Sequence, residues 1–197
     1  MISKQQHIII VPGLGDDLIK TKFFIDKWKQ DDKKCEIWNA NWSDLNESYK
    51  DKYNRLQAHI NKLNKDNKKV SLVGISAGAG LVGNIFMDNP KLIHKMINIC
   101  GRLRMKKTGL PTLEFITFRN KAYKDSISSF EKSANQLSKE LRSRIITFSG
   151  LYDELVPTST IALTGARNIT IPFIGHNFCI MIALLFYKTR ILDFLKS

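Results

Sequence analysis

The stretch Gly74-Ile75-Ser76-Ala77-Gly78 places a serine between two glycines, directly after the apolar run Val70 to Val73. The run has the length and β-branched content of a buried strand, and a helix is expected to follow it. A serine on so sharp a strand-to-helix turn projects its hydroxyl above the sheet, and a Cβ on either glycine would collide with neighbouring backbone. The stretch therefore predicts a nucleophilic serine at the edge of a sheet.

Six short apolar runs in all have the character of buried strands. They are His7 to Val11, Cys35 to Ala40, Val70 to Gly74, Lys95 to Cys100, Arg144 to Ser149 and Asn168 to Phe173. Between most of them lie segments of helical period, such as the one from Tyr49 to Leu63. This alternation predicts a three-layer α/β fold in which a mostly parallel six-stranded sheet lies between helices. With 197 residues, 43% of them hydrophobic, the chain is expected to form a single domain over residues 1–197.

The interval from Arg102 to Ser143 is the longest between two predicted strands. Its portions Pro111 to Asn120 and Ser126 to Leu141 have helical character, and together they exceed the length of one crossover helix. We expect a small cap or long insertion after the fourth strand, placed over the strand ends as a lid at residues 102–143. A plain crossover with a long loop is the alternative.

The residues just after each strand are candidates for a functional site, because open parallel sheets bind ligands outside the carboxyl ends of their strands. A serine hydroxyl is a poor nucleophile at neutral pH without a base to take its proton, and histidine suits that role best. Of the four histidines, His7, His59 and His94 fall away from the carboxyl edge. His176 follows the sixth strand and is the candidate base.

A catalytic imidazole needs a buried carboxylate on its other ring nitrogen, which fixes the tautomer and offsets the developing charge. Asp153 follows the fifth predicted strand, in a loop held by Val156 and Pro157. Its neighbour Glu154 is the competitor, a longer acid that we expect to be solvated. Asp153 is the preferred partner of His176.

Attack on a carbonyl group leaves an oxyanion that needs two preorganised hydrogen-bond donors. The amide of Ala77, at the start of the helix after the serine, is one candidate. The amide of Leu14, in the turn after the first strand, is the other. Turn formation alone is the alternative explanation for Gly13 and Gly15, which flank Leu14.

Taken together, these motifs resemble those of the α/β-hydrolase family, in that family's order of serine, acid and histidine. They are Pro12-Gly13-Leu14-Gly15, Gly74-Ile75-Ser76-Ala77-Gly78, Gly150 to Pro157 and Gly175-His176, and they span most of the chain. The resemblance implies a nucleophile at Ser76, a base at His176 and an orienting acid at Asp153. It also implies that Leu14 and Ala77 are the oxyanion donors.

The resemblance further implies a serine hydrolase of the carboxylesterase or lipase kind. The expected substrate is a small molecule with an ester-like bond, a carboxylic ester or a thioester, opened through an acyl-enzyme on Ser76 with no metal or organic cofactor. Two features depart from the family. Pro12 stands where many relatives have histidine, and the first antiparallel strands of the full fold are missing, as in small esterase-like members. A non-catalytic protein that uses the fold for binding is the alternative function.

Three further side chains are candidates for contact with a substrate. Arg102 and Arg104 follow the fourth predicted strand at the same edge, where one of them could steer an anionic substrate. A surface role is the alternative for both. Trp42 lies just past the second strand, and it either lines the pocket or packs in the core.

The formal charge of +13 invites the hypothesis of nucleic-acid binding, but the lysines are scattered among Asp and Glu as on solvated helix faces. No specific nucleic-acid partner is expected. The sequence Gly78-Ala79-Gly80-Leu81-Val82-Gly83 also matches the dinucleotide-binding pattern G-x-G-x-x-G. Its first glycine comes too late after the strand, so tight helix-to-sheet packing explains these glycines better.

The sequence favours a cytoplasmic protein. The apolar run that ends at Val11 is too short for a signal peptide, and three widely spaced cysteines indicate reduced thiols rather than disulfides or a zinc site. The apolar stretch Phe178 to Tyr187 is ten residues long. That is about half a bilayer span, so it predicts a final helix packed on the sheet. Peripheral contact with a membrane through Phe178 and the basic residues is left open.

Overall fold

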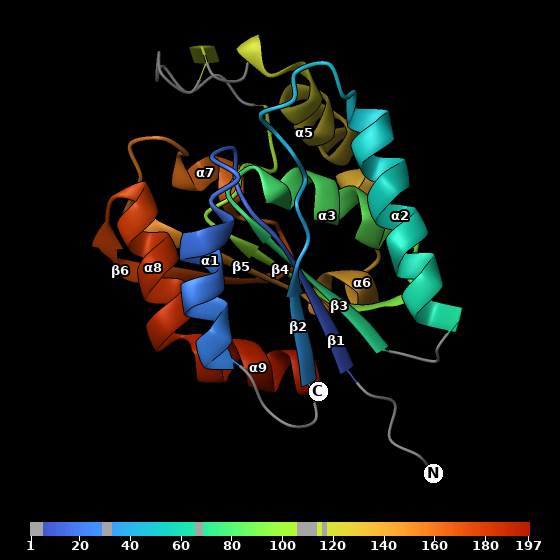
Figure 1. Cartoon of the computed structure of the whole chain (residues 1–197). Helices are drawn as coiled ribbons and strands as arrows, with labels where there is room; N and C mark the ends of the chain where they lie inside the picture. Colours follow the sequence, from blue (N-terminus) through green and yellow to red (C-terminus); the bar gives the residue numbers. More distant parts are fainter. Residues whose placement is uncertain (1–5, 29–32, 66–68, 106–113, 116–117) are drawn as a thin grey trace.

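The computed structural model describes residues 6–28, 33–65, 69–105, 114–115 and 118–197, and its six strands form one sheet (Figure 1). The strands are β1 (Gln6–Val11), β2 (Lys33–Ile37), β3 (Lys69–Ile75), β4 (Ile93–Ile99), β5 (Ile145–Tyr152) and β6 (Arg167–Ile174). They lie in the order β2-β1-β3-β4-β5-β6, and each neighbouring pair is parallel. The carboxyl ends of these strands therefore meet at one edge of the sheet.

Helices cover both faces of the sheet, which confirms the predicted three-layer α/β architecture (Figure 1). One face carries α1 (Leu18–Ile25), α8 (His176–Phe186) and α9 (Lys188–Lys196), and the other carries α2 (Tyr49–Lys65), α3 (Gly78–Asp88) and α5 (Lys121–Ser133). The shorter elements are α6 (Lys139–Ser143), α7 (Thr158–Ile161) and the 3₁₀ turns Asp26–Trp28 and Ala134–Gln136.

A hydrophobic core on each face of the sheet holds these layers together. Successive side chains of a strand point to opposite faces. Ile8 and Ile10 of β1 therefore belong to the core under α1, α8 and α9, whereas Ile9 and Val11 belong to the core under α2 and α3. All four side chains are fully buried. Strands that are apolar on both faces are typical of a parallel sheet covered by helices, which explains why near-continuous apolar runs mark them in the sequence.

The predicted strands are confirmed, with boundaries that shift by a few residues. β2 ends at Ile37, three residues before the predicted Ala40, and β5 ends at Tyr152, three residues after the predicted Ser149. The backbone beyond β2 turns to bind Lys52 of α2. The Lys52 side chain is fully buried, and its amino group donates to Ala40 O at 3.2 Å and to Asn41 O at 2.6 Å.

The segment after β4 differs from the predicted pair of helices. α5 packs against α3 as part of the core. The helix predicted from Ser126 to Leu141 is broken, because α5 ends at Ser133 and the side chain of Ser138 caps a separate α6. Residues 111–113 and 116–117 of the predicted helical portion Pro111 to Asn120 lie outside the described residues, and residues 114–115 and 118–119 are helical. The lid at residues 102–143 stays a prediction.

The first glycine of the G-x-G-x-x-G pattern, Gly78, packs the start of α3 against the end of β1, whereas Gly80 and Gly83 pack α3 against α5. A Cβ on Gly80 would lie 2.7 Å from the Ser126 hydroxyl oxygen, and one on Gly83 would lie 2.7 Å from the Phe130 ring. Both glycines lie inside α3, beyond the turn that follows β3. Close packing is therefore the role of these glycines, and the predicted helix-to-sheet contact is present at Gly78, while Gly80 and Gly83 contact a helix instead.

The apolar stretch Phe178 to Tyr187 forms most of α8, which confirms the predicted helix packed on the sheet, but α8 is not the final helix, because α9 follows it. α8 buries Cys179, Ile182, Ala183 and Leu184 in the core that it shares with α1 and α9. Among the helices in the described part of the chain, none has the length and apolar content needed to cross a membrane.

A substitution at Gly78 tests how tightly the turn between β3 and α3 is packed. A Cβ there would lie 2.1 Å from the Val11 carbonyl oxygen and 2.9 Å from that of Pro12. Because both are backbone atoms that cannot easily give way, Gly78→Ala should lower the free energy of unfolding by about 3 kcal/mol. Gly15→Ala is the matched control, since a Cβ there meets nothing within 4 Å. Urea unfolding measures both losses, and equal losses would contradict this close packing.

Candidate active site

Ser76 lies at the sharp turn between β3 and α3, with a backbone φ of +50°. Left-handed backbone is uncommon for a residue other than glycine and costs conformational energy. Two backbone hydrogen bonds hold Ser76 in this conformation. Ser76 N donates to Ile99 O of β4 at 2.9 Å, and Ser76 O accepts from Ala79 N at 3.1 Å. The predicted strand-to-helix turn is therefore present, at the carboxyl edge of the sheet.

The hydroxyl of Ser76 contacts the imidazole of His176. Ser76 Oγ lies 2.9 Å from His176 Nε2, although the two residues are 100 positions apart in sequence. His176 is buried and is the first residue of α8. It follows Gly175, whose φ of +93° turns the chain from β6 into the helix. The sequence therefore identified the histidine that meets the serine.

A buried carboxylate continues this chain of hydrogen bonds. Asp153 Oδ2 lies 2.7 Å from His176 Nδ1, and the Asp153 side chain is fully buried. Its other oxygen accepts from the amides of Leu155 at 2.9 Å and Val156 at 2.7 Å. A carboxylate only accepts, so the ring proton lies on Nδ1 and Nε2 faces the serine as an acceptor. Ser76, His176 and Asp153 form a hydrogen-bonded triad.

Glu154 is exposed, as predicted, but its carboxylate is not simply solvated. Both of its oxygens accept from the His176 backbone amide, at 3.0 and 3.1 Å. An amide at the start of a helix has no partner within that helix, and a carboxylate there also suits the helix dipole. The two neighbouring acids therefore hold different parts of His176: Asp153 holds the ring, and Glu154 holds the backbone.

The turn after β1 lies directly beside Ser76. A Cβ on Gly13 would lie 2.9 Å from the Ser76 Cβ and 3.3 Å from its hydroxyl oxygen. A hydrogen bond from Asp16 N to Gly13 O, 3.1 Å long, closes the turn. Leu14 follows Gly13 and Ala77 follows Ser76, so both predicted amides belong to the peptides next to this contact. Their role as oxyanion donors stays a prediction.

Trp42 packs in the core, which is one of its two predicted positions. It is 1% exposed, and its indole N–H donates to Pro12 O at 3.1 Å. Asp16 accepts from Trp42 N at 3.1 Å and from the amide and hydroxyl of Ser43 at 2.9 and 3.0 Å. These bonds tie the turn after β1 to the loop after β2. The sequence analysis did not single out Asp16 as a residue that positions the site. Its place next to Gly15, in the turn that follows β1, is a signal that could have identified it.

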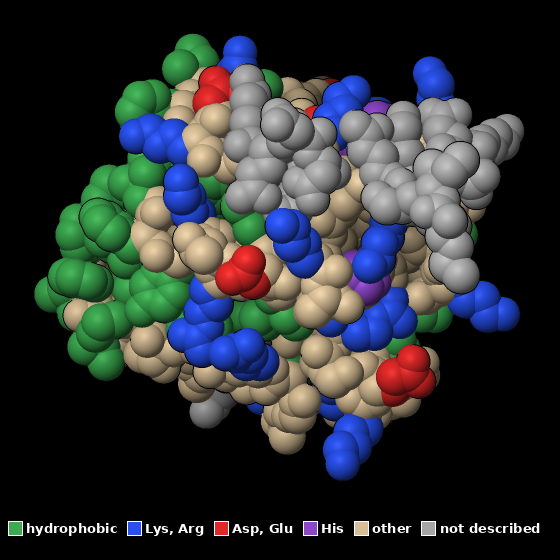
Figure 2. Space-filling view, turned by 90° about the horizontal axis from the view of Figure 1, so that it is seen from below, with side chains coloured by type: hydrophobic (Ala, Val, Ile, Leu, Met, Phe, Trp, Pro, Cys, Tyr) green, Lys and Arg blue, Asp and Glu red, His purple; other side chains and the backbone are tan. Residues whose placement is uncertain are grey.

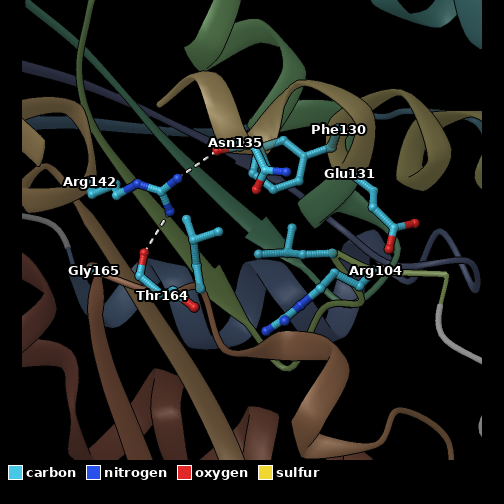
Figure 3. Close-up of a pocket in the computed structure, with 10 residues that line it drawn as sticks. Arg104, Phe130, Glu131, Asn135, Arg142, Thr164 and Gly165 are labelled. Atoms are coloured by element: carbon cyan, nitrogen blue, oxygen red, sulfur yellow. Dashed lines mark hydrogen bonds between the residues drawn. The ribbon is translucent and has the colours of Figure 1, made fainter. Parts of the chain in front are cut away.

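Arg102 and Arg104 donate to backbone carbonyl groups. Arg102 is 2% exposed, its Nε donates to Arg104 O at 2.8 Å, and burial lowers the pKa of its guanidinium. Arg104 donates to Ala162 O. It also lines a cavity of about 520 Å³ between α5, α6 and the segment before β6 (Figure 3), whose described lining residues include no member of the triad.

The surface role predicted for Arg102 is wrong, because its side chain is buried. The hydrogen bonds of Arg102 and Arg104 to backbone carbonyl groups favour packing over steering of an anionic substrate.

The other three histidines lie elsewhere, which agrees with the elimination made from sequence. Burial alone would raise the pKa of Glu36, but contacts with His7 and His59 outweigh it and hold that pKa at about 2. His94 lies at the amino end of β4, and burial lowers its pKa to about 4. Among the described residues, no cluster of three or more His, Cys, Asp and Glu side chains is arranged to hold a metal ion.

No protein-family model matches the chain, and no curated protein matches its sequence. Solved structures do match it. A structure described for LipS and LipT, two metagenome-derived lipolytic enzymes, is 13% identical with a TM-score of 0.68, over 98% of this chain and 94% of that one. Est1E from Butyrivibrio proteoclasticus is 11% identical with a TM-score of 0.65, over 98% and 90%. MGS-MChE2, an α/β hydrolase from a lagoon-sediment metagenome, is 16% identical with a TM-score of 0.63, over 98% and 91%. The chain has the α/β-hydrolase fold.

The α/β-hydrolase fold explains why the triad meets at one place. β3, β5 and β6 run parallel in one sheet, so the turns that follow them leave the same edge. Every strand pair in the described sheet is parallel, in agreement with the predicted absence of the first antiparallel strands.

Glu154→Ala should free the His176 amide. A hydrogen bond to a charged acceptor contributes about 1.5–3 kcal/mol, so this amide should exchange with deuterium at least about tenfold faster. The Val156 amide, which donates to Asp153, is the internal control and should keep its rate. Hydrogen exchange followed by NMR measures both amides. Unchanged protection at His176 would contradict the contact between Glu154 and the start of α8.

Proposed function

We propose that this protein is a serine hydrolase that opens an ester-like bond, a carboxylic ester or a thioester, through an acyl-enzyme on Ser76. The observation that carries the proposal is the continuous hydrogen-bonded triad. A serine hydroxyl becomes a nucleophile when a neighbouring base takes its proton. The distance of 2.9 Å between Ser76 Oγ and His176 Nε2 suits that transfer.

In the first half of the proposed reaction, Ser76 Oγ attacks the carbonyl carbon while its proton passes to His176 Nε2. Asp153 accepts from His176 Nδ1 and stabilises the imidazolium that forms. The carbonyl oxygen becomes an oxyanion, for which the amides of Leu14 and Ala77 are the proposed donors, each contributing about 3 kcal/mol. His176 then gives its proton to the leaving alcohol or thiol, and the acyl group stays on Ser76.

In the second half, water replaces the leaving group. His176 Nε2 takes a proton from the water molecule, whose oxygen attacks the acyl carbonyl carbon. The bond between the acyl carbon and Ser76 Oγ breaks, the proton returns to the serine, and the acid leaves. Each step uses the side chains and amides of this chain, so the proposed reaction requires no metal or organic cofactor.

The names of the similar structures support the same class of reaction. LipS and LipT are called lipolytic enzymes, and MGS-MChE2 is called an α/β hydrolase. A binding protein that keeps the fold without turnover is the alternative, because fold and function are separable. Covalent labelling of the serine distinguishes the two.

A fluorophosphonate probe tests the proposal, because such probes react with activated serines. The wild-type protein should be labelled, and Ser76→Ala should not. Ser159→Ala, which removes an exposed serine of α7, is the matched control and should be labelled like the wild type. Fluorescence after denaturing electrophoresis reads the label. A folded but unlabelled wild-type protein would contradict the hydrolase proposal and favour the binding protein.

A further inference from the structure

Five large apolar side chains that lie close to Asp153 or His176 in the sequence are exposed. They are Leu151, Tyr152, Phe173, Ile174 and Phe178, which are 43–65% exposed, and we call them the apolar rim. The first two directly precede Asp153, and the others lie within three residues of His176. Figure 2 shows the molecule from below, the side where Figure 1 places the C-terminus, and hydrophobic side chains gather at the left of that view. Apolar patches of this kind mark binding sites on protein surfaces.

The apolar rim flanks, along the chain, the turn that carries the histidine of the triad. Tyr152 lies opposite Ile174 in the register of β5 and β6. The rings of Phe173 and Phe178 pack edge to face, with centroids 5.4 Å apart and an interplanar angle of 82°. An apolar chain that extends from the triad past this turn would contact the rim, and it would lose water-exposed surface there.

The charges around the apolar rim do not favour an anionic group. Within residues 150–156 and 172–178, the charged side chains are Asp153 and Glu154, and both are acids. Both are also bound to His176. The two arginines that the sequence offered for an anion donate to backbone carbonyls instead. A negatively charged acyl group would meet like charge here, whereas a neutral apolar one would not.

We infer that the apolar rim is the acyl-chain subsite, and that the substrates are esters of apolar carboxylic acids of medium length, such as octanoyl esters. The inference rests on the proposed hydrolase function and specifies its substrate class. An acyl chain that lies on the open apolar rim is covered by protein on one side only. Each methylene should therefore raise kcat/KM about twofold, compared with about fourfold for full burial.

A series of p-nitrophenyl esters tests the inference, with acetyl, butyryl, hexanoyl and octanoyl groups used below their solubility limits. For the wild type, kcat/KM should rise about 15-fold from butyryl to octanoyl, because four methylenes are added. In Ile174→Ser and Phe178→Ser the octanoyl-to-butyryl ratio should fall at least about threefold. Phe186→Ser is the matched control and should keep the wild-type ratio, since it removes a phenylalanine that is 73% exposed at the far end of the same helix.

A wild-type kcat/KM that does not rise with chain length would overturn the inference, even if a variant failed to fold. So would an equal fall of the ratio in Phe186→Ser. Fluorophosphonate labelling separates this failure from failure of the proposed function: a labelled protein without chain-length preference remains a serine hydrolase, whereas an unlabelled one loses both assignments. If Phe178→Ser weakens sedimentation with phosphatidylglycerol vesicles but leaves the ratio unchanged, the rim is a membrane contact and the inference is wrong.

Discussion

The close approach of the start of α3 to the end of β1 is the constraint on which the rest of the site depends. Gly78 lies so near the Val11 carbonyl oxygen that no side chain fits between them. The same approach sets Gly13 against Ser76. The serine completes the turn with a left-handed backbone, which the hydrogen bond to Ile99 O holds in place. The hydroxyl and the amides beside it are therefore fixed together.

Hydrogen bonds to the backbone fix the remaining groups of the site. The Asp153 carboxylate is satisfied by amides of its own loop, which leaves one oxygen for the imidazole. Glu154 holds the amide of His176, and Asp16 ties the turn after β1 to the loop after β2. Polar groups that are bound in this way keep one geometry in a partly buried site. The side chains of Ser76, His176 and Asp153 are therefore held within hydrogen-bond distance of one another.

The strands and the triad could be predicted because their signals are local. Apolar runs mark the strands, and a residue just after a parallel strand must lie at the carboxyl edge, which leads to Ser76 and His176. The remaining contacts of the site depend on the paths of the loops, and no local sequence pattern predicts those paths. Asp153 and Glu154 are neighbours, yet one binds a ring and the other a backbone amide. Asp16 binds residues 26 and 27 positions away, and the burial of Arg102 depends on packing of the segment after β4.

An acyl group on Ser76 is tested most directly by mixing the protein with excess p-nitrophenyl acetate and quenching in acid after short intervals. We expect a burst of about one equivalent of p-nitrophenolate per chain. Mass spectrometry should then find one acetyl group on the peptide that contains Ser76. Steady release without a burst, together with an unmodified Ser76 peptide, would contradict covalent catalysis at this serine.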